Sequence, residues 1–359
     1  EHFRFVLTEA FDGRHFEFAL FLENDLKVAP DFLYYFRSSA WLLEEDPSLF
    51  CVSAWNDNGI AEAVSDEKRL FRTDYFPGLG WMIRADTWRQ IRGKWPRFPS
   101  TGWDHWLRHG SGLGRRECIV PEVSRTHHMD VGAGATVHKG SKAAKRLQAM
   151  PLSKLPPGGL GDLSYLLQDR YDRDLQARVR SARRARIQDL GNLVGGGEYV
   201  IPYSREEYRR LFEPLQLSPA QPRAAHRGVI IARHVHSRAR VILVDRRQGE
   251  GLLPEEDLWR PDPRRAIHKA APAQSCQQLC AGLGLQCDRR QLEFINSCEH
   301  LQAAFPCEDG CGHQVGDELP AYVHDVKRDT ARQCLMTDDL MPTCGGASPA
   351  TTRLCVCVP

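Results

Sequence analysis

The sequence predicts an α/β protein that ends in a small disulfide-rich module. Apolar strand-like runs alternate with helical patterns over the first part of the chain, and cysteines are concentrated near its end. At roughly 150 residues per domain, 359 residues suggest two or three domains. We place them at residues 1–145, 160–250 and 272–359. The formal net charge of +2 gives no indication of a nucleic-acid partner.

The first domain alternates helices and strands. Residues 3–11 have a helical pattern, and residues 16–22 form an apolar strand. Apolar residues recur at helical spacing over 31–43, and residues 49–54 fit a buried strand. Asp86 fits the N-cap of a short helix. We expect residues 140–160, which contain Pro, Gly and Lys, to form a linker.

A small α/β unit is expected next, over residues 199–246. Ser204 and Glu207 have the spacing of a capping box, so a helix should begin there. Residues 227–245 then predict two strands joined by a short turn at Ser237. Pro-rich residues 254–274 connect this unit to the cysteine-rich tail.

The strand over 16–22 ends in a polar triplet, Glu23-Asn24-Asp25. Side chains alternate along a strand, so Glu23 and Asp25 should project to one side and Asn24 to the other. Carboxylate oxygens suit a hard cation such as Mg²⁺ or Mn²⁺. The same residues also suit an ordinary polar turn that leaves the core, and this stretch alone leaves both interpretations open.

The tail contains ten of the twelve cysteines, between Cys276 and Cys357. This density is typical of a disulfide scaffold in an oxidising compartment. Structural zinc is the alternative, but its usual Cys-x2-Cys spacing is missing from the close pairs. We therefore predict disulfides, and the pairing cannot be deduced from the sequence.

Several stretches, in this order, resemble the family of N-acetylglucosaminyltransferase I. They are LENDLKVAPDF, LFCVSAWNDNG, RTDYFPGLGWMI, KWP, WDHWLR and RRECIVPEVSRT, followed by DLSYLLQDRYDRDLQARV at 162–179. The resemblance covers roughly residues 1–246 and implies a GT-A type glycosyltransferase fold. In the tail, SCQQLC and CGGASPATTRLCVC resemble the Cys-rich end of N-acetylglucosaminyltransferase V, which suggests an accessory module for protein or glycan contact.

The resemblance assigns donor-site roles to several residues of the first domain. It implies a bound Mn²⁺ with Asp25 as its ligand, and it places Glu23 against the donor sugar. Asn24 stands where the family has an acid that helps to hold the ribose. Leu79 lies in a turn of the active-site wall, although Gly-Leu-Gly also fits an ordinary tight turn. Thr136 stands where a serine contacts the diphosphate.

By the same resemblance, Asp104 is the base that takes the proton of the acceptor hydroxyl. A helix N-cap is the alternative for Asp104, and His105 is either a competing base or a surface residue. Cys51 and Cys118 form a disulfide by resemblance, with two buried free thiols as the alternative.

Two further histidines, His127 and His128, are interpreted as surface residues rather than as ligands.

The implied function is transfer of N-acetylglucosamine from UDP-GlcNAc, in β1,2 linkage, to a mannose of an N-glycan core. The family implies a type II membrane protein of the Golgi lumen. The alternatives are a family member that acts on O-mannosyl protein and a non-catalytic glycan-binding protein. The chain opens without Met, inside a helical pattern. We therefore expect the membrane anchor, and the strands that hold most of the uridine site, to precede it.

Overall fold

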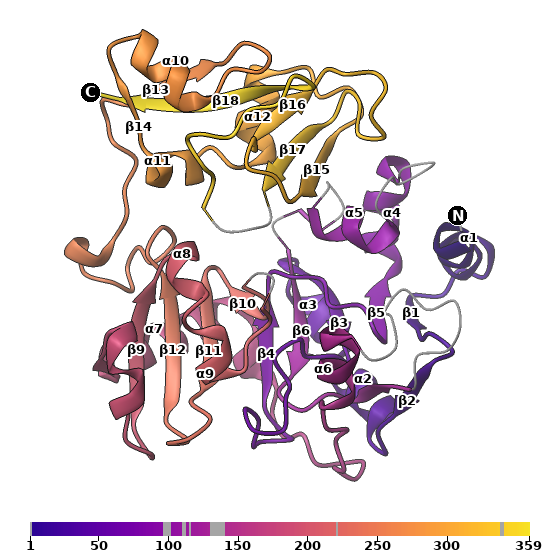
Figure 1. The fold of residues 1–359 in the computed structure, drawn as a ribbon. Helices are drawn as coiled ribbons and strands as arrows, with labels where there is room; N and C mark the ends of the chain where they lie inside the picture. The colour runs from indigo at the N-terminus through magenta and orange to yellow at the C-terminus, as the bar shows by residue number, and fades with distance from the viewer. Residues whose placement is uncertain are drawn as a thin grey trace. The chain divides into compact units, whose positions relative to one another are not determined.

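A computed structural model describes residues 2–95, 102–109, 113–114, 116–129, 141–219, 222–337 and 341–359. Its internal contacts divide the chain into two compact units (Figure 1). The first comprises Glu1–Arg97 and Leu113–Leu258, and the second comprises Phe98–Gly112 and Trp259–Pro359. Within these described ranges, no helix is both long enough and apolar enough to cross a bilayer.

The first sheet of unit 1 has the strand order β1-β5-β3-β6-β4. β3 and β6 run parallel, and the other neighbouring pairs are antiparallel. Strand β3 is buried at every position, as its apolar sequence predicts. The five strands are β1 (Phe18–Phe21), β3 (Leu49–Ser53), β4 (Leu70–Thr73), β5 (Trp81–Arg84) and β6 (Glu117–Pro121).

Short helices surround this sheet. The predicted N-terminal helix is present as α1, which continues as a π-helical turn, η1. The helix predicted over 31–43 is divided in two, and both parts place apolar side chains in one core with Leu49, Val52 and Ile119. The helical elements are α1 (His2–Thr8), η1 (Glu9–Gly13), α2 (Phe32–Ser39), α3 (Leu42–Glu45), α4 (Ala85–Ile91), η2 (Arg92–Lys94) and α6 (Lys142–Gln148).

Two local predictions in this region are wrong. The N-cap of α4 is Arg84, and Asp86 lies inside the first turn, where its carboxylate accepts a hydrogen bond from the Thr87 N–H. The expected linker over 140–160 contains α6. The Ser141 side chain caps this helix by accepting from the Ala144 N–H, and Lys, Ala, Arg, Leu and Gln favour helix in its interior.

A second sheet in unit 1 has the order β10-β11-β12-β9-β8. The predicted capping box of Ser204 and Glu207 is present, but it begins a helix of one turn, and a second short helix follows. The two predicted strands pair antiparallel as β11 and β12. The elements are η3 (Ser164–Leu166), α7 (Gln168–Ser181), β8 (Arg183–Arg184), η4 (Ile187–Asn192), β9 (Glu198–Tyr203), α8 (Arg205–Tyr208), α9 (Phe212–Leu215), β10 (Ala225–His226), β11 (Val229–Arg233), β12 (Arg240–Asp245) and η5 (Glu255–Asp257).

Unit 2 is built around the long strand β18, which pairs with β13, β14 and β16. Strand β17 pairs with β16 and β15, and α5 contacts β15. The elements are α5 (Trp103–His109), β13 (Ala266–Lys269), α10 (Cys276–Gly282), β14 (Gln286–Cys287), α11 (Arg289–Glu293), α12 (Cys298–Ala304), β15 (Cys311–Gln314), β16 (Ala321–Val323), β17 (Cys334–Thr337) and β18 (Thr351–Val358).

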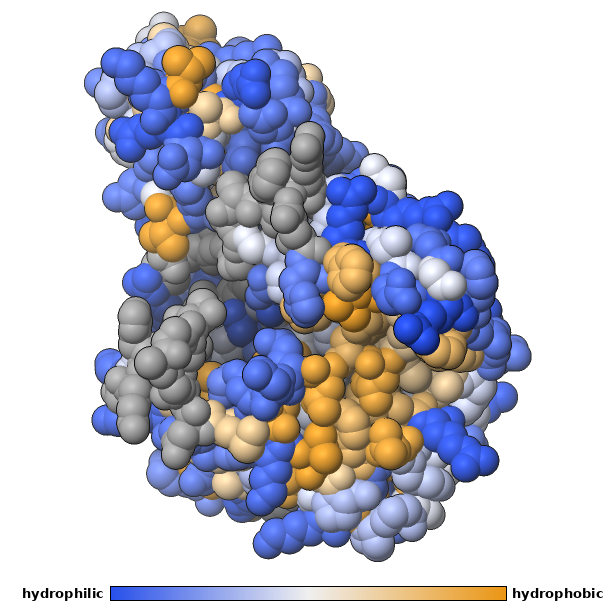
Figure 2. Space-filling model, turned by 90° about the vertical axis from the view of Figure 1, so that its right-hand side faces the viewer, coloured by the Kyte–Doolittle hydropathy of each residue, from blue (hydrophilic) through white to orange (hydrophobic). Residues whose placement is uncertain are grey.

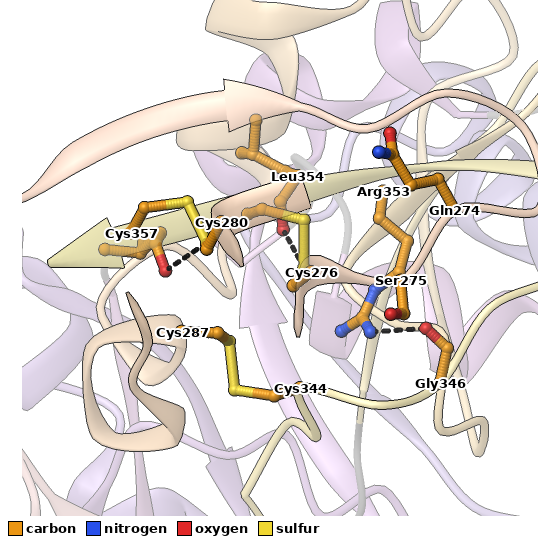
Figure 3. The surroundings of a disulfide bond; sticks show 12 residues. Gln274, Ser275, Cys276, Cys280, Cys287, Cys344, Gly346, Arg353, Leu354 and Cys357 are labelled. Atoms are coloured by element: carbon orange, nitrogen blue, oxygen red, sulfur yellow. Dashed lines mark hydrogen bonds between the residues drawn. A yellow bond between two sulfur atoms is a disulfide. The ribbon is translucent and has the colours of Figure 1, made fainter. Parts of the chain in front are cut away.

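All ten tail cysteines form disulfides, so the zinc alternative is excluded. Two of the bridges attach α10 to β18, and a third joins β14 to the loop before β18 (Figure 3). Beside them, the buried guanidinium of Arg353 donates to the carbonyls of Gly346, Leu319 and Thr343. The pairs are Cys276–Cys355, Cys280–Cys357, Cys287–Cys344, Cys298–Cys311 and Cys307–Cys334.

One face of unit 1 exposes apolar side chains around the N-terminal elements. β1 is an edge strand of its sheet. Figure 2, which views the side of the molecule where β1 and β2 lie in Figure 1, shows a continuous hydrophobic area. Uncovered strand edges and large apolar patches are unusual on isolated soluble domains. The large apolar residues exposed in these elements and their loops are Phe5, Phe16, Leu22, Val28 and Leu33.

Candidate functional site

The triplet Glu23-Asn24-Asp25 connects β1 to a short strand, β2 (Leu26–Val28). β1 ends at Phe21, so the triplet lies in a turn after the strand and does not continue it as predicted. Glu23 and Asp25 are half-buried and Asn24 is exposed, so exposure still alternates along the three residues.

Strand β7 (Thr126–His128) fixes the position of this turn. It pairs antiparallel with β2, with His128 opposite Leu26 and Thr126 opposite Val28. The Met129 N–H donates to the Asp25 carbonyl over 2.8 Å, which extends the ladder into the turn. The Asp25 carboxylate and the His128 ring therefore become neighbours, with Nε2 of His128 3.3 Å from Oδ2 of Asp25.

The two histidines of β7 have different surroundings, as alternation along a strand requires. The His127 ring approaches the Met150 carbonyl through Nδ1, over 2.9 Å. The His128 ring lies against Asp25, and only 13% of its side chain is exposed. The sequence interpretation treated both as surface residues and so missed the position of His128. The pattern Thr-His-His after a buried strand was the available signal, but it does not identify the partner strand.

The Gly-Leu-Gly turn also contacts β7, through the side chain of Thr126. Gly78, Leu79 and Gly80 all have positive φ, at 68°, 51° and 91°. The Thr126 hydroxyl donates to the Leu79 carbonyl over 2.7 Å. A Cβ at Gly80 would lie 3.0 Å from Cγ2 of Thr126, so only glycine allows this close approach. Leu79 itself packs against a small apolar cluster that includes Trp55.

A buried ion pair lies at the start of β7. Arg125, which precedes β7, has its Nε and Nη2 3.1 Å from Oδ2 of Asp31, and both side chains are fully buried. Arg125 also donates to the carbonyls of Val123 and Glu67 and lies over the Tyr35 ring. Burial raises the pKa of Asp31, although the positive charge of Arg125 opposes that shift. This contact explains why Asp31 does not cap α2 with its side chain.

Further from the turn, Cys51 and Cys118 form a disulfide between the parallel strands β3 and β6. Both residues are fully buried. The bridge therefore connects the central strand, β3, to its neighbour β6 in the sheet that carries the Glu23–Asp25 turn.

The proposed base, Asp104, is carried by α5 of unit 2. It is the second residue of the helix and therefore not its N-cap, and Nη1 of Arg108 lies 2.7 Å from its Oδ2. The side chain of His105 lies outside the described part of the structure, as does Thr136. In unit 1 the turn with Asp25 and the turn with Leu79 thus both contact β7, the first through His128 and the second through Thr126. Asp104 belongs to unit 2.

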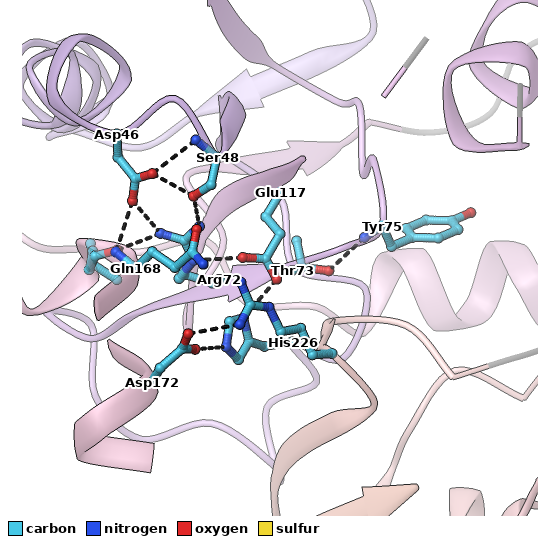
Figure 4. A network of polar contacts seen from close by, with 11 residues as sticks. Asp46, Ser48, Arg72, Thr73, Tyr75, Glu117, Gln168, Asp172 and His226 are labelled. Atoms are coloured by element: carbon cyan, nitrogen blue, oxygen red, sulfur yellow. Dashed lines mark hydrogen bonds and ion pairs between the residues drawn. The ribbon is translucent and has the colours of Figure 1, made fainter. Parts of the chain in front are cut away.

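A second polar cluster in unit 1 is centred on Arg72 of β4, whose side chain is fully buried (Figure 4). Its Nη1 lies 2.8 Å from Oδ2 of Asp46, and its Nε lies 2.7 Å from Oε2 of Glu117. The same guanidinium donates to the Ser48 hydroxyl and to the Leu166 carbonyl. Burial alone would raise the pKa of Asp46, but the hydrogen bonds that its carboxylate accepts from Ser48, Arg72 and the Gln168 N–H outweigh burial and lower the pKa.

His226 extends this cluster to the second sheet. Its Nδ1 lies 2.6 Å from Oε1 of Glu117, and its Nε2 lies 2.7 Å from Oδ1 of Asp172 on α7. Burial would raise the pKa of Glu117, but the hydrogen bond from His226 and the charges of His226 and Arg72 lower it. Ionised carboxylates accept and do not donate, so both ring nitrogens donate in this arrangement. The cluster therefore connects β4 and β6 to α7 and β10.

Within the described residues, no group of three or more Asp, Glu, His or Cys side chains gathers as a ready-made metal site. The pair of Asp25 and His128 supplies two potential ligands. Oδ1 of Asp25 is buried and has no hydrogen-bond partner among the described residues. A carboxylate and an imidazole are both suitable ligands for a divalent transition ion, so the residues present fit such a group.

Comparison with known proteins defines the class. The mixed α/β unit and its turns belong to a glycosyltransferase family: the model of the GNT-I family matches residues 1–255. The chain therefore belongs to the GNT-I family, which confirms the predicted resemblance. The model of glycosyltransferase family 18 matches residues 240–357, which covers the cysteine-rich tail.

The chain is also similar to an enzyme of known activity. The alpha-1,3-mannosyl-glycoprotein 2-beta-N-acetylglucosaminyltransferase of Arabidopsis thaliana is 31% identical over 253 residues. The alignment covers 68% of this chain and 55% of the relative, so the chain spans about half the length of that relative.

Proposed function

We propose that the protein is an inverting glycosyltransferase with a GT-A type fold. It transfers N-acetylglucosamine from UDP-GlcNAc, in β1,2 linkage, to a mannose of an N-glycan core. Membership of the GNT-I family and the activity in the name of the Arabidopsis relative support this function. The activity is proposed for the whole protein, because the chain corresponds to 55% of the relative's length.

The observation that carries the proposal is the arrangement around β7. The turn with Glu23 and Asp25 and the turn with Leu79 come from sequence segments more than 50 residues apart, as their numbers show. Both contact the three-residue strand β7, one through the Asp25–His128 contact and the other through the Thr126 hydroxyl. A nucleotide-sugar site requires such convergence of carboxylates and a close backbone turn.

We assign the donor to this place. Asp25 would hold Mn²⁺, which when bound would offset the negative charge that develops on the departing diphosphate. Glu23 contacts the donor sugar. Asn24 accepts and donates hydrogen bonds toward the ribose, where a carboxylate could only accept. Leu79 contributes to the wall of the site.

Asp104 acts on the acceptor. Its carboxylate takes the proton of the mannose hydroxyl while that oxygen attacks C1 of N-acetylglucosamine. The new C1–O bond forms as the bond from C1 to the diphosphate oxygen breaks, so the configuration at C1 inverts and UDP leaves. No covalent intermediate with the enzyme is formed.

The cell compartment follows from the same proposal. Six disulfides agree with an oxidising secretory compartment. We place the protein in the Golgi lumen as a type II membrane protein, and we assign protein or glycan contact to the cysteine-rich tail.

Transfer to a five-mannose N-glycan tests this function in the native-length protein, with and without Mn²⁺. We expect one N-acetylglucosamine to be added in the presence of Mn²⁺, and Asp104→Asn to abolish the transfer. Asp169→Asn, at an exposed carboxylate of α7, is the matched control and should be fully active. Transfer to an O-mannosyl peptide alone, or no transfer by folded protein, would contradict the proposed acceptor or the activity.

A further inference from the structure

The hydrogen-bond geometry of the Asp25–His128 contact differs from that of an ordinary surface ion pair. Nδ1 of His128 lies 3.0 Å from the Met129 carbonyl oxygen. A carbonyl oxygen can only accept, so Nδ1 carries the hydrogen in this contact. In the neutral ring the other nitrogen, Nε2, then presents its lone pair, and that nitrogen is the one that faces Asp25.

Two acceptors therefore face each other, Nε2 of His128 and Oδ2 of Asp25, at 3.3 Å. Such a pair is stable only with a positive partner, either a proton on the ring or a cation held by both. The second oxygen of the carboxylate, Oδ1, is buried without a hydrogen-bond partner in the described part of the chain. A buried carboxylate oxygen without a donor is costly, and coordination of a cation would remove that cost.

The ring also has the support that is typical of metal-bound histidines. Such histidines almost always donate the hydrogen of their other nitrogen to a carbonyl or carboxylate, which fixes the tautomer and the orientation of the ring. The Met129 carbonyl does this for His128. Adjacent ligands of an octahedral ion with bonds of about 2.1 Å lie ~3 Å apart, close to the observed separation.

We propose that His128, through Nε2, is the second protein ligand of a divalent transition-metal ion whose first protein ligand is Asp25. The inference rests on the proposed function, because it places this ion where the donor diphosphate would complete the coordination. An imidazole favours transition ions, whereas Mg²⁺ and Ca²⁺ prefer oxygen ligands alone. The site therefore selects Mn²⁺ or Co²⁺ over Mg²⁺ and Ca²⁺.

Metal binding, measured without turnover, tests the proposal. The probe is Mn²⁺ alone, added to the native-length protein, with the free ion quantified by electron paramagnetic resonance. We expect one bound ion. Both His128→Ala and Asp25→Asn should weaken binding by about tenfold or more, since even residues that only support metal ligands change affinity by about 10–100-fold. Excess Mg²⁺ should compete poorly.

His127→Ala is the matched control, because His127 is the neighbouring residue of the same strand and contacts the Met150 carbonyl instead. It should bind Mn²⁺ as the wild type does. Electron spin-echo modulation provides a second readout that is independent of affinity: bound Mn²⁺ should show coupling to an imidazole nitrogen, which disappears in His128→Ala. Circular dichroism confirms that each variant is folded.

Each other outcome overturns the inference in a distinguishable way. In one such outcome Asp25→Asn loses Mn²⁺ binding, His128→Ala binds Mn²⁺ fully, and the wild type shows no coupling to an imidazole nitrogen. This result would keep Asp25 as a metal ligand and would show that His128 is not one. Wild-type protein that binds no Mn²⁺, yet transfers N-acetylglucosamine, would refute the metal site and leave the transferase proposal standing. Metal binding without transfer would refute the transferase proposal alone.

Discussion

Arg72 and Glu117 form a buried ion pair in which Nε lies 2.7 Å from Oε2 and neither side chain is more than 4% exposed. Arg72 belongs to β4 and Glu117 to β6, which are neighbours in the first sheet. Through His226, Glu117 is also connected to α7 and to the second sheet. The Arg72–Glu117–His226 network thus helps to hold the two sheets of unit 1 together through side chains that are almost fully buried.

Removal of Arg72 should therefore destabilise unit 1 severely. In Arg72→Met, Asp46 and Glu117 lose their shared cation while they remain buried. Breaking a buried pair by removal of one partner costs about 3–5 kcal/mol. Urea unfolding should show that loss. The control Arg14→Met removes an exposed pair with Glu9 and should change the free energy of unfolding by at most about 1 kcal/mol. Equal effects would contradict the account.

Asp74 should make stability depend on pH near neutrality. Asp74 is exposed as a residue, but desolvation of its carboxyl by the surrounding protein and then the charge of Glu117 raise the pKa to about 7. The unfolded chain loses this proton near pH 4, so the folded state binds more protons between about pH 4 and 7. The contribution is complete below about pH 4 and is lost as the pH rises to about 7.

The test compares Asp74→Asn with the wild type at pH 5 and pH 8. The variant should lose less free energy of unfolding over this interval, because amide side chains do not titrate there. Asp162→Asn is the control: serine hydrogen bonds lower the pKa of Asp162, so its titration lies below the interval. A wild-type pH dependence in Asp74→Asn would show that Asp74 does not carry the effect.

Leu79 should invert the usual order of Ala and Gly. Its φ of 51° costs a residue with a side chain roughly 1–2 kcal/mol. Leu79→Ala and Leu79→Gly lose the same packing, but only the glycine variant also removes the strain. We expect the free energy of unfolding, measured by thermal unfolding, to be about 1 kcal/mol higher for Leu79→Gly than for Leu79→Ala.

The control position is Leu33 in helix α2. There the glycine variant should be about 1 kcal/mol less stable than the alanine variant. The same order at both positions would contradict the strained conformation of Leu79.

Asn24 should limit donor affinity without preventing metal binding. If it stands beside the ribose, Asn24→Asp should tighten UDP-GlcNAc binding several-fold, because hydrogen bonds to a charged group are worth about 1.5–3 kcal/mol. Isothermal titration of the native-length protein with Mn²⁺ present measures this change. Asn192→Asp, at an exposed position in η4, should leave the affinity unchanged. Unchanged or weaker binding in Asn24→Asp would remove Asn24 from the ribose site.

Local patterns were sufficient for the elements whose signals are local. Strand β3, strands β11 and β12, and the capping box of Ser204 and Glu207 follow from periodicity and side-chain chemistry over a few residues. The helix predicted over 31–43 is divided into α2 and α3, and local patterns did not predict this division. They also did not predict the ion pair between Asp31 and Arg125, which is 94 residues away. Such a contact depends on tertiary packing, which has no local sequence signal.

The same limit applied to the site. The family motifs predicted roles for Asp25 and Leu79, but motif positions do not reveal that both turns contact strand β7. His128 was interpreted as a surface residue, but its side chain lies against Asp25. Its environment is set by the register of β7 on β2, in which His128 lies opposite Leu26. A shift of one residue would have brought His127 to Asp25 instead.

The stereochemistry of the transfer product is the decisive test of the proposed inverting reaction. The native-length protein, with Mn²⁺, UDP-GlcNAc and a five-mannose N-glycan, should give a product whose new linkage is β1,2 by nuclear magnetic resonance. The sugar is α-linked in the donor, so this result means inversion at C1. An α-linked product, or no product from folded protein that binds Mn²⁺, would contradict the account.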